Sequence, residues 1–291
     1  MTSQPSTSQD LVASFYTLSG APNGEPARHA FIDRLHAAKA AGWAGIGLAA
    51  LDYQSMLQSH QPDELLAMTA DADLPVAEIE FLPFDLARAD GRPSEQELVL
   101  YGMADLFGSR QLNATLGGTC SEEDEPQAAR CLAAVADAAA DHGLVVALEF
   151  MPFAAVKTIN QALRIVERAD RSNAGVLVDA YHFFRGGSSL DALRAAGPEL
   201  IAGVQLDDAP ADAPEDLLSE TRTSRLLPGE GGLDLVGMLR AIATTGADVP
   251  IGVELLSTKL QALDIDVLAR RTYQSTAAVC AASSLDTSSR S

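Results

Sequence analysis

The chain has 291 residues, of which 47% are apolar and 21% charged, and its formal net charge is −20. That length suits a single α/β barrel, which typically needs about 250 residues. The acidic balance argues against a nucleic-acid partner, because proteins that bind nucleic acid present a basic surface.

Three further features bear on location. No apolar run approaches the ~18 residues needed to span a bilayer, so we expect no membrane partner. Residues 1–6 carry neither the basic region nor the apolar stretch of a secretory signal. The three cysteines, Cys120, Cys131 and Cys280, form no Cys-x-x-Cys pair, so neither a disulfide framework nor a thiolate zinc site is indicated. We therefore expect a cytoplasmic protein.

Short apolar runs typical of buried strands alternate along the chain with segments typical of helices. In chain order, strands are expected at 11–18, 43–48, 76–81, 111–116, 144–149, 175–179, 201–206 and 250–255. Helices are expected at 27–41, 62–72, 94–106, 125–142, 158–169, 188–196 and 234–244. Ser94-Glu-Gln-Glu97 is a capping box that opens the third helix. A long connection is expected at 209–232, where it forms either a lid over the site or an ordinary loop.

The alternation of strands and helices predicts parallel pairing through right-handed crossovers. Eight such units in one chain indicate a single (β/α)8 TIM barrel over residues 12–276. Residues 1–11 are expected to be disordered, and residues 277–291 to form a flexible C-terminal tail. An open doubly wound sheet is the alternative, but no Gly-x-Gly-x-x-Gly turn follows the first expected strand.

Four consecutive expected strands carry an oxygen-bearing side chain at or near their ends, namely Glu149, Asp179, Gln205 and Glu254. The carboxyl ends of barrel strands open onto one face, so these oxygens should converge. Carboxylates crowded together repel one another, and a divalent cation relieves that repulsion. Oxygen ligands favour Mg2+ or Mn2+, with Co2+ or Zn2+ as alternatives. The plainer interpretation is that Asp179 caps the next helix and His182 lies in a loop.

The motifs in the second half of the chain resemble those of the xylose isomerase-like, or AP-endonuclease family 2, barrels. They are Val-Ala-Leu-Glu149-Phe-Met-Pro, Leu-Val-Asp179-Ala-Tyr-His182, Val-Gln205-Leu-Asp-Asp208, Arg225-Leu-Leu-Pro-Gly-Glu230-Gly and Gly-Val-Glu254. The first half agrees with that family only in its alternation of strands and helices.

The resemblance implies roles for individual residues. Glu149, Asp179, Gln205 and Glu254 match the family's metal ligands, and Glu149 and Glu254 also match the pair that exchanges protons with the substrate. His182 and Arg225 match residues that contact substrate oxygens, and Glu80, near the end of the third strand, is assigned to substrate binding with them. The resemblance also suggests a homodimer.

One departure from the family pattern matters, and the histidines of the chain bear on a second point. Most members carry His where this chain has Gln205, whereas bacterial 3-dehydroshikimate dehydratases of the superfamily are similar to this chain in using Gln. The DNA-repair endonucleases of the superfamily need additional His ligands, and His29, His36 and His142 fall on expected helices or their ends. A DNA substrate is therefore not expected.

Three functions remain open on sequence alone. The first is a metal-dependent isomerase or epimerase of a small sugar or polyol, acting through an enediolate. The second is a lyase that dehydrates a keto-polyol such as an inosose or 3-dehydroshikimate through the same first step. The third is a ligand-binding barrel without turnover, against which the intact carboxylate set argues.

Overall fold

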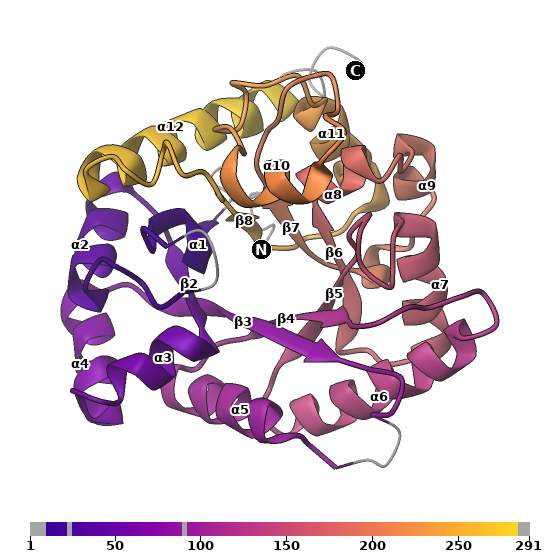
Figure 1. Cartoon of the computed structure of the whole chain (residues 1–291), viewed down its shortest axis with the longest axis horizontal. Helices are drawn as coiled ribbons and strands as arrows, with labels where there is room; N and C mark the ends of the chain where they lie inside the picture. Colours follow the sequence, from indigo (N-terminus) through magenta and orange to yellow (C-terminus); the bar gives the residue numbers. More distant parts are fainter. Residues whose placement is uncertain (1–9, 22–24, 89–91, 285–291) are drawn as a thin grey trace, which may run out of the picture.

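Eight parallel strands close into a barrel in their order along the chain, each paired with the next and β8 with β1 (Figure 1). The structure is a computed structural model, and it describes residues 10–21, 25–88 and 92–284. The strands are β1 (Leu11–Ala13), β2 (Gly45–Ala49), β3 (Val76–Phe84), β4 (Gln111–Leu116), β5 (Val145–Glu149), β6 (Ala174–Asp179), β7 (Ile201–Leu206) and β8 (Ile251–Val253). The prediction of a (β/α)8 barrel is confirmed.

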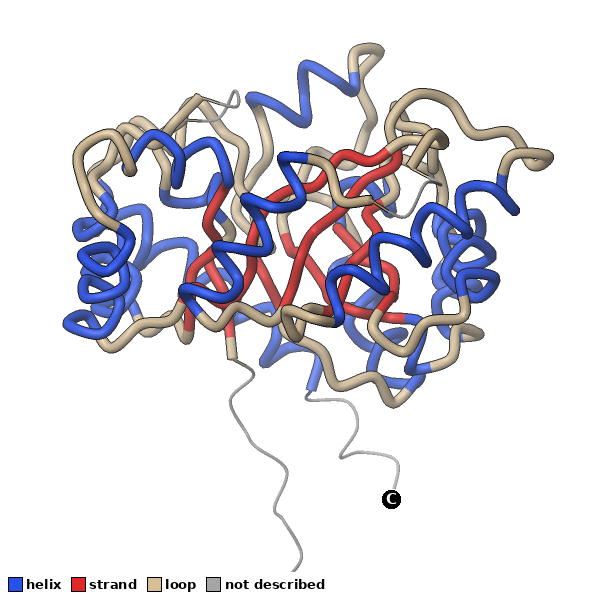
Figure 2. Tube along the Cα trace, turned by 90° about the horizontal axis from the view of Figure 1, so that it is seen from below, coloured by secondary structure: helices blue, strands red, loops and turns tan. Residues whose placement is uncertain are grey.

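Helices surround the strands on all sides (Figures 1 and 2). They are α1 (Phe15–Leu18), α2 (Phe31–Ala41), α3 (Ala50–Met56), α4 (Pro62–Ala72), α5 (Glu95–Phe107), α6 (Glu125–Ala140), α7 (Ile159–Ala169), α8 (Ala180–Arg185), α9 (Leu190–Arg194), α10 (Leu217–Thr223), α11 (Leu235–Thr245) and α12 (Ile265–Ser284), with a 3-10 turn at Pro198–Leu200. Within the described ranges, no helix is long and apolar enough to cross a membrane.

Local sequence signals explain several of these boundaries. The Ser94 hydroxyl accepts a hydrogen bond from the Glu97 amide at 3.2 Å, and the Glu97 carboxylate accepts one from the Ser94 amide. The expected capping box therefore opens α5. Gly42 ends α2 with φ of 103°, a left-handed conformation that glycine adopts without strain. The apolar faces of these helices pack on the outward side chains of the strands, among them Ile79 and Leu112, which are fully buried.

Two expected boundaries are wrong. The first expected strand, 11–18, is only β1 followed by the short helix α1, because the backbone amides of Ser14 and Phe15 bond to Val253 and Glu80 and so turn the chain. The expected tail at 277–291 begins within α12, which continues to Ser284. Residues 1–9 and 285–291, parts of the expected terminal segments, lie outside the described residues.

The helix α12 is held by contacts with a distant part of the sequence. The Trp43 indole donates a hydrogen bond to the Ala269 carbonyl at 3.2 Å, and its ring meets Tyr273 edge to face at 5.5 Å. Thr272 and Thr276 are fully buried. In Figure 1 the helix lies beside α2 and α11, where it completes the ring of helices.

The interior of the barrel differs from the shell around it, because it holds polar side chains and glycines. Glu78 and Gln111, on β3 and β4, hydrogen-bond to each other at 3.3 Å. Gly203 on β7 lies where a Cβ atom would come 3.0 Å from Gln111, although β7 and β4 are not neighbours. The Gln111 side chain therefore reaches across the barrel to the backbone of a strand that is not its neighbour. The absence of a side chain at Gly203 leaves the space that Gln111 occupies.

Candidate functional site

The four predicted ligand residues lie at the same end of the barrel. Glu149 and Asp179 are the last residues of β5 and β6, Gln205 is the penultimate residue of β7, and Glu254 directly follows β8. In the strand register, Asp179 pairs with Gln205, which in turn pairs with Gly252. Parallel strands in this register bring their carboxyl ends to one rim, as the sequence analysis expected.

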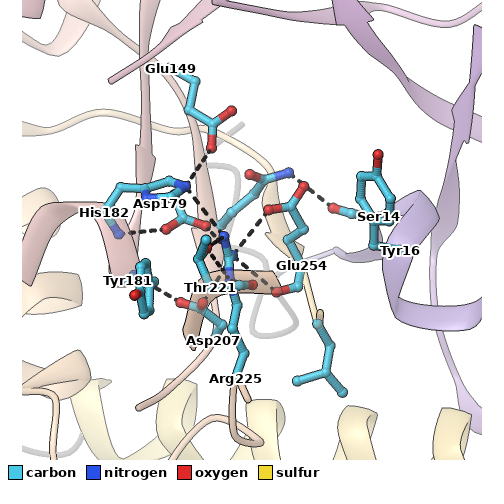
Figure 3. A network of polar contacts seen from close by, with 12 residues as sticks. Ser14, Tyr16, Glu149, Asp179, Tyr181, His182, Asp207, Thr221, Arg225 and Glu254 are labelled. Carbon is cyan, nitrogen blue, oxygen red and sulfur yellow. Dashed lines mark hydrogen bonds and ion pairs between the residues drawn. The ribbon is translucent and has the colours of Figure 1, made fainter. Parts of the chain in front are cut away.

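The Arg225 guanidinium lies among the carboxylates (Figure 3). Its Nη1 atom is 3.0 Å from Asp179 Oδ2, 2.9 Å from Asp207 Oδ2 and 3.0 Å from Glu254 Oε2. The Arg225 side chain is only 2% exposed, so water does not screen these ion pairs. One guanidinium nitrogen thus holds three carboxylates of the site together.

Two further groups fix the position of Arg225. The Thr221 hydroxyl, on α10, accepts a hydrogen bond from Nη2 at 2.8 Å. The Tyr181 ring lies 5.0 Å from the guanidinium carbon, a distance suited to a cation–π contact. Sequence analysis assigned Arg225 to substrate oxygens, and in the structure its described contacts are with groups of the chain itself.

Asp207 is a member of the cluster to which the sequence analysis gave no role. It follows β7 directly, it is fully buried, and its Oδ1 accepts the Tyr181 amide at 2.9 Å. Burial raises its pKa well above the usual value, with a further increase from Asp179, and Arg225 opposes both effects. The sequence signal that could have identified Asp207 is its position directly after a strand. Asp208 follows the same strand, so this signal does not tell the two residues apart.

Asp179 caps a helix, as the plainer interpretation of the sequence expected, whereas its role as a metal ligand stays a prediction. His182 lies within that helix, α8, and not in a loop. Asp179 Oδ1 accepts the His182 amide at 2.8 Å, which caps the N-terminus of α8, while Oδ2 faces Arg225. His182 Nε2 lies 3.5 Å from Glu149 Oε1 and 3.3 Å from Arg225 Nη2. Burial lowers the pKa of His182 to about 3, so the imidazole is neutral at physiological pH.

The cluster has more negative than positive charge. Glu149, Asp179, Asp207 and Glu254 face a single guanidinium. Burial, together with Glu254 and Asp179, raises the pKa of Glu149 well above its ordinary value. Burial raises the pKa of Glu254 to about 7 although Arg225 opposes the shift. A group of carboxyls with raised pKa values gains from a bound cation, because the cation replaces shared protons as the source of positive charge.

Three side chains of the cluster are placed so that they could hold a metal ion, and Glu254 is not one of them. Ligand atoms of Glu149, Asp179 and His182 lie within 4.8 Å of one another. Glu149 Oε1 and Gln205 Oε1 are buried and form no hydrogen bond with the described residues, although His182 Nε2 lies 3.5 Å from Glu149 Oε1. Buried acceptors without a partner are uncommon in folded proteins, and a metal ion is one way to satisfy them. The predominance of oxygen atoms favours hard cations, and His182 adds one nitrogen.

Glu80 contacts residues at β1 and β2, and the charge of Glu254 in the cluster also acts on it. Glu80 Oε1 accepts the Phe15 amide at 2.9 Å, and the side chain is 2% exposed. Gly47 of β2 leaves the space for the Glu80 carboxyl, which a Cβ atom would occupy. Burial and the neighbouring Glu78 raise the pKa of Glu80 well above its usual value. The predicted role of Glu80 in substrate binding stays a prediction.

The connection that carries Arg225 is anchored by Asp208. The Asp208 carboxylate accepts the backbone amides of Ala209, Gly229, Gly231 and Leu233 at 2.8–3.1 Å. Residues Asp208 and Leu226 also form an antiparallel bridge. The loop therefore has the fixed geometry of an ordinary connection in this structure, and it delivers Arg225 to the cluster from outside the barrel strands.

Comparison with known proteins gives a family and several relatives. A family model described as the xylose isomerase-like TIM barrel matches residues 35–271. An inosose isomerase from Bacillus velezensis is 31% identical over 160 residues, which cover 54% of this chain and 56% of that protein. A 3-dehydroshikimate dehydratase from Pseudomonas aeruginosa is 27% identical over 235 residues, 79% of this chain and 37% of that protein. The chain thus spans about half the length, or less, of these curated relatives.

A solved structure shares the fold. The crystal structure of a protein named IOLI, with a bound zinc atom, superimposes with a TM-score of 0.78 at 24% identity. The superposition covers 93% of this chain and 97% of that one.

Proposed function

The chain belongs to the xylose isomerase-like TIM barrel family, and we propose that it is a divalent-metal-dependent isomerase or epimerase of a small sugar or polyol. The observation that supports this most is the convergence of Glu149, Asp179 and Glu254 on one rim, with the buried oxygen of Gln205 facing no donor among the described residues. Relatives named inosose isomerase support the same class of reaction.

Glu149, Asp179, Gln205 and Glu254 would hold the cation, with His182 close enough to join them. Mn2+ and Mg2+ suit these ligands best, and Co2+ or Zn2+ are alternatives. When bound, the cation supplies Lewis-acid stabilisation of negative charge on substrate oxygens. The protein supplies the geometry and the proton-transfer groups.

Glu149 and Glu254 are the proposed acid and base. Their side chains are 14% and 12% exposed, whereas those of Asp179, Asp207 and Arg225 are 0–2% exposed, so the two glutamates are the carboxyls of the cluster that a substrate can reach. Their raised pKa values bring them closer to physiological pH, where general acid–base catalysis is most effective. One would remove a proton from the carbon beside the carbonyl, and the other would return it.

His182, Arg225 and Glu80 are proposed to bind the substrate, as the resemblance implies. Each of these residues is 2% exposed in this structure, so this role requires the groups that cover them to move when a substrate enters. The neutral His182 ring can donate or accept a hydrogen bond without carrying charge into the site. Arg225 also keeps Asp179 and Glu254 in place, so its replacement should affect both binding and the position of the ligands.

Exchange of solvent deuterium into the substrate tests the proton-transfer step. With Mn2+ and an inosose or ketose panel, we expect the wild type to incorporate deuterium at the carbon beside the carbonyl, and Glu254→Gln to lose this exchange. Glu230→Gln is the matched control, because Glu230 is half exposed and pairs only with Arg271 among its described salt-bridge partners. Undiminished exchange in Glu254→Gln would refute the role assigned to Glu254.

A dehydratase acting on a keto-polyol is the second candidate. Two observations favour it: Gln205 stands where most family members have His, and a 3-dehydroshikimate dehydratase matches 79% of this chain. After the same proton removal, a β-hydroxyl would leave as water, so a lasting rise in the absorbance of a conjugated product separates this reaction from isomerisation. Metal-dependent binding without any product would instead favour a non-catalytic barrel.

The remaining assignments are proposals of the same standing. We propose a small carbohydrate or polyol as the partner, no nucleic acid, a cytoplasmic location and a homodimer. Light scattering of the purified protein tests the dimer, and elemental analysis identifies the metal that the protein carries.

A further inference from the structure

The orientation of the Gln205 amide decides whether this residue can bind a cation. The amide oxygen has lone pairs and can bind a cation, whereas the NH2 group acts only as a hydrogen-bond donor. In the structure Gln205 Nε2 donates a hydrogen bond to Ser14 Oγ at 3.1 Å. The opposite atom, Oε1, is buried without a hydrogen-bond partner among the described residues. Ser14 therefore holds the end of the amide that a cation cannot use.

The Ser14 hydroxyl accepts this bond because its own hydrogen is already engaged. Ser14 Oγ donates to Glu78 Oε1 at 2.5 Å, deeper in the barrel. A hydroxyl has one hydrogen, so once it is given to Glu78, the remaining neighbour must be a donor. The amide placed the other way round would set two oxygens, those of Gln205 and Glu78, against that single hydrogen. Glu78 thus determines, through Ser14, which end of Gln205 faces the rim.

A glycine on β8 leaves room for the contact between Gln205 and Ser14. Gln205 is on β7 and Ser14 follows β1, while the strand between them carries Gly252, which pairs with Gln205. A Cβ atom at Gly252 would lie 3.2 Å from Ser14 Oγ and 3.3 Å from Gln205 Cγ, closer than side chains normally tolerate. Ser14 is itself fixed, because its amide bonds to the Val253 carbonyl at 3.1 Å.

Water does not help to orient the Gln205 amide, because neither Gln205 nor Ser14 is accessible to solvent. Ser14 is 0% exposed and Gln205 is 1% exposed, so the amide is held by the chain alone. We propose that Ser14 and Glu78 are positioning residues that keep Gln205 Oε1 directed at the cation, and that metal affinity depends on them. This inference rests on the proposed metal site, but it concerns a part of the barrel that the proposed reaction does not otherwise use.

The test is the dissociation constant for Mn2+, measured by calorimetry and by electron paramagnetic resonance, without any substrate. Ser14→Ala should weaken Mn2+ binding by about 10- to 100-fold, the usual effect of losing a group that orients a metal ligand. Ser14→Cys keeps the volume and offers only a weak acceptor, so it should show the same direction if Ser14→Ala folds poorly. Ser109→Ala is the control, because Ser109 is a buried serine whose described hydrogen bond goes to the Val76 carbonyl, at the start of β3 and away from the carboxyl ends of the strands.

A double-mutant cycle separates orientation from a general disturbance. A glutamate at position 205 has two equivalent carboxylate oxygens, so either one can face the cation without help from Ser14. In the Gln205→Glu background, Ser14→Ala should therefore change the Mn2+ constant by no more than about twofold, the limit for independent sites. An unchanged constant in both Ser14 variants, or an equal loss in the Gln205→Glu background, would overturn the inference. Failure of the wild type to bind Mn2+ would instead overturn the proposed metal site itself.

Discussion

Replacing Arg225 by methionine should destabilise the metal-free protein strongly, because the change removes one charge from among several buried ones. Arg225 Nη1 lies within 3.0 Å of Asp179, Asp207 and Glu254, and the guanidinium is 2% exposed. Breaking a buried ion pair costs about 3–5 kcal/mol, since it leaves uncompensated charge in the interior. With a shift of about 2–4 °C per kcal/mol, the melting temperature should fall by roughly 6–20 °C.

The loss should depend on pH in a defined direction. Burial and mutual repulsion already raise the pKa values of Glu149 and Asp207, and removing Arg225 raises them further. A carboxyl with a raised pKa in the folded state destabilises the fold when it is forced to ionise, so the penalty grows with rising pH. The difference in melting temperature between wild type and Arg225→Met should therefore be larger at pH 8 than at pH 5.5.

Scanning calorimetry in the presence of a chelator measures both effects. Arg171→Met is the control, because Arg171 forms an exposed ion pair with Asp137, and such pairs contribute little. A fall in Arg225→Met no larger than that in Arg171→Met would refute the view that Arg225 balances the cluster. So would a difference that stays constant between the two pH values.

Three other outcomes follow from described contacts. The pKa of Glu254 is raised to about 7, so the affinity for Mn2+ should increase as pH rises from 6 to 8, with proton release seen by calorimetry in buffers of different ionisation enthalpy; a constant affinity would contradict this. Asp208→Asn replaces one carboxylate oxygen by an NH2 group, so two of the four backbone amides bound by Asp208 lose their acceptor, at a cost of about 1–3 kcal/mol per amide left unsatisfied and with faster proteolysis of the loop after Arg225; unchanged proteolysis would show that Asp208 does not anchor it. Ser94→Ala removes the N-cap of α5 and should cost about 1 kcal/mol in urea unfolding, whereas Ser94→Asp should retain the cap; equal losses would argue against capping.

The fold was predictable because its strongest signals are local. Most strands are short runs dominated by apolar residues, although β3 and β4 also carry polar ones. Residues such as Gly42 and Ser94 mark helix boundaries through their own backbone preferences. The helix α12 was missed as a whole, because no helix was expected after residue 244 and the small and polar residues of α12 form no clear apolar face. Its position depends on Trp43, more than two hundred residues away in sequence, and no local pattern reports such a contact.

The same distinction explains the site. Glu149, Asp179 and Glu254 could be proposed because the end of a strand is a position visible in the sequence. Asp207 and Ser14 could not be assigned, because their importance comes from Arg225 and Gln205, which reach them from other strands and loops. Sequence periodicity reports which face a residue occupies, but not which side chain meets it across a barrel.

The glycines and polar groups inside the barrel have a consequence for evolving this protein toward heat tolerance. Gly203 and Gly252 leave room for Gln111 and Ser14, so the side chains inside the barrel bury little apolar surface. Thermal stability must therefore come from the packing of the helices against the outside of the strands. Selection for thermal resistance alone should accumulate substitutions in those helices. Substitutions that fill the barrel interior with aliphatic side chains would raise the stability, because buried charges are often less stabilising than apolar replacements. The same substitutions would remove the polar groups of the site.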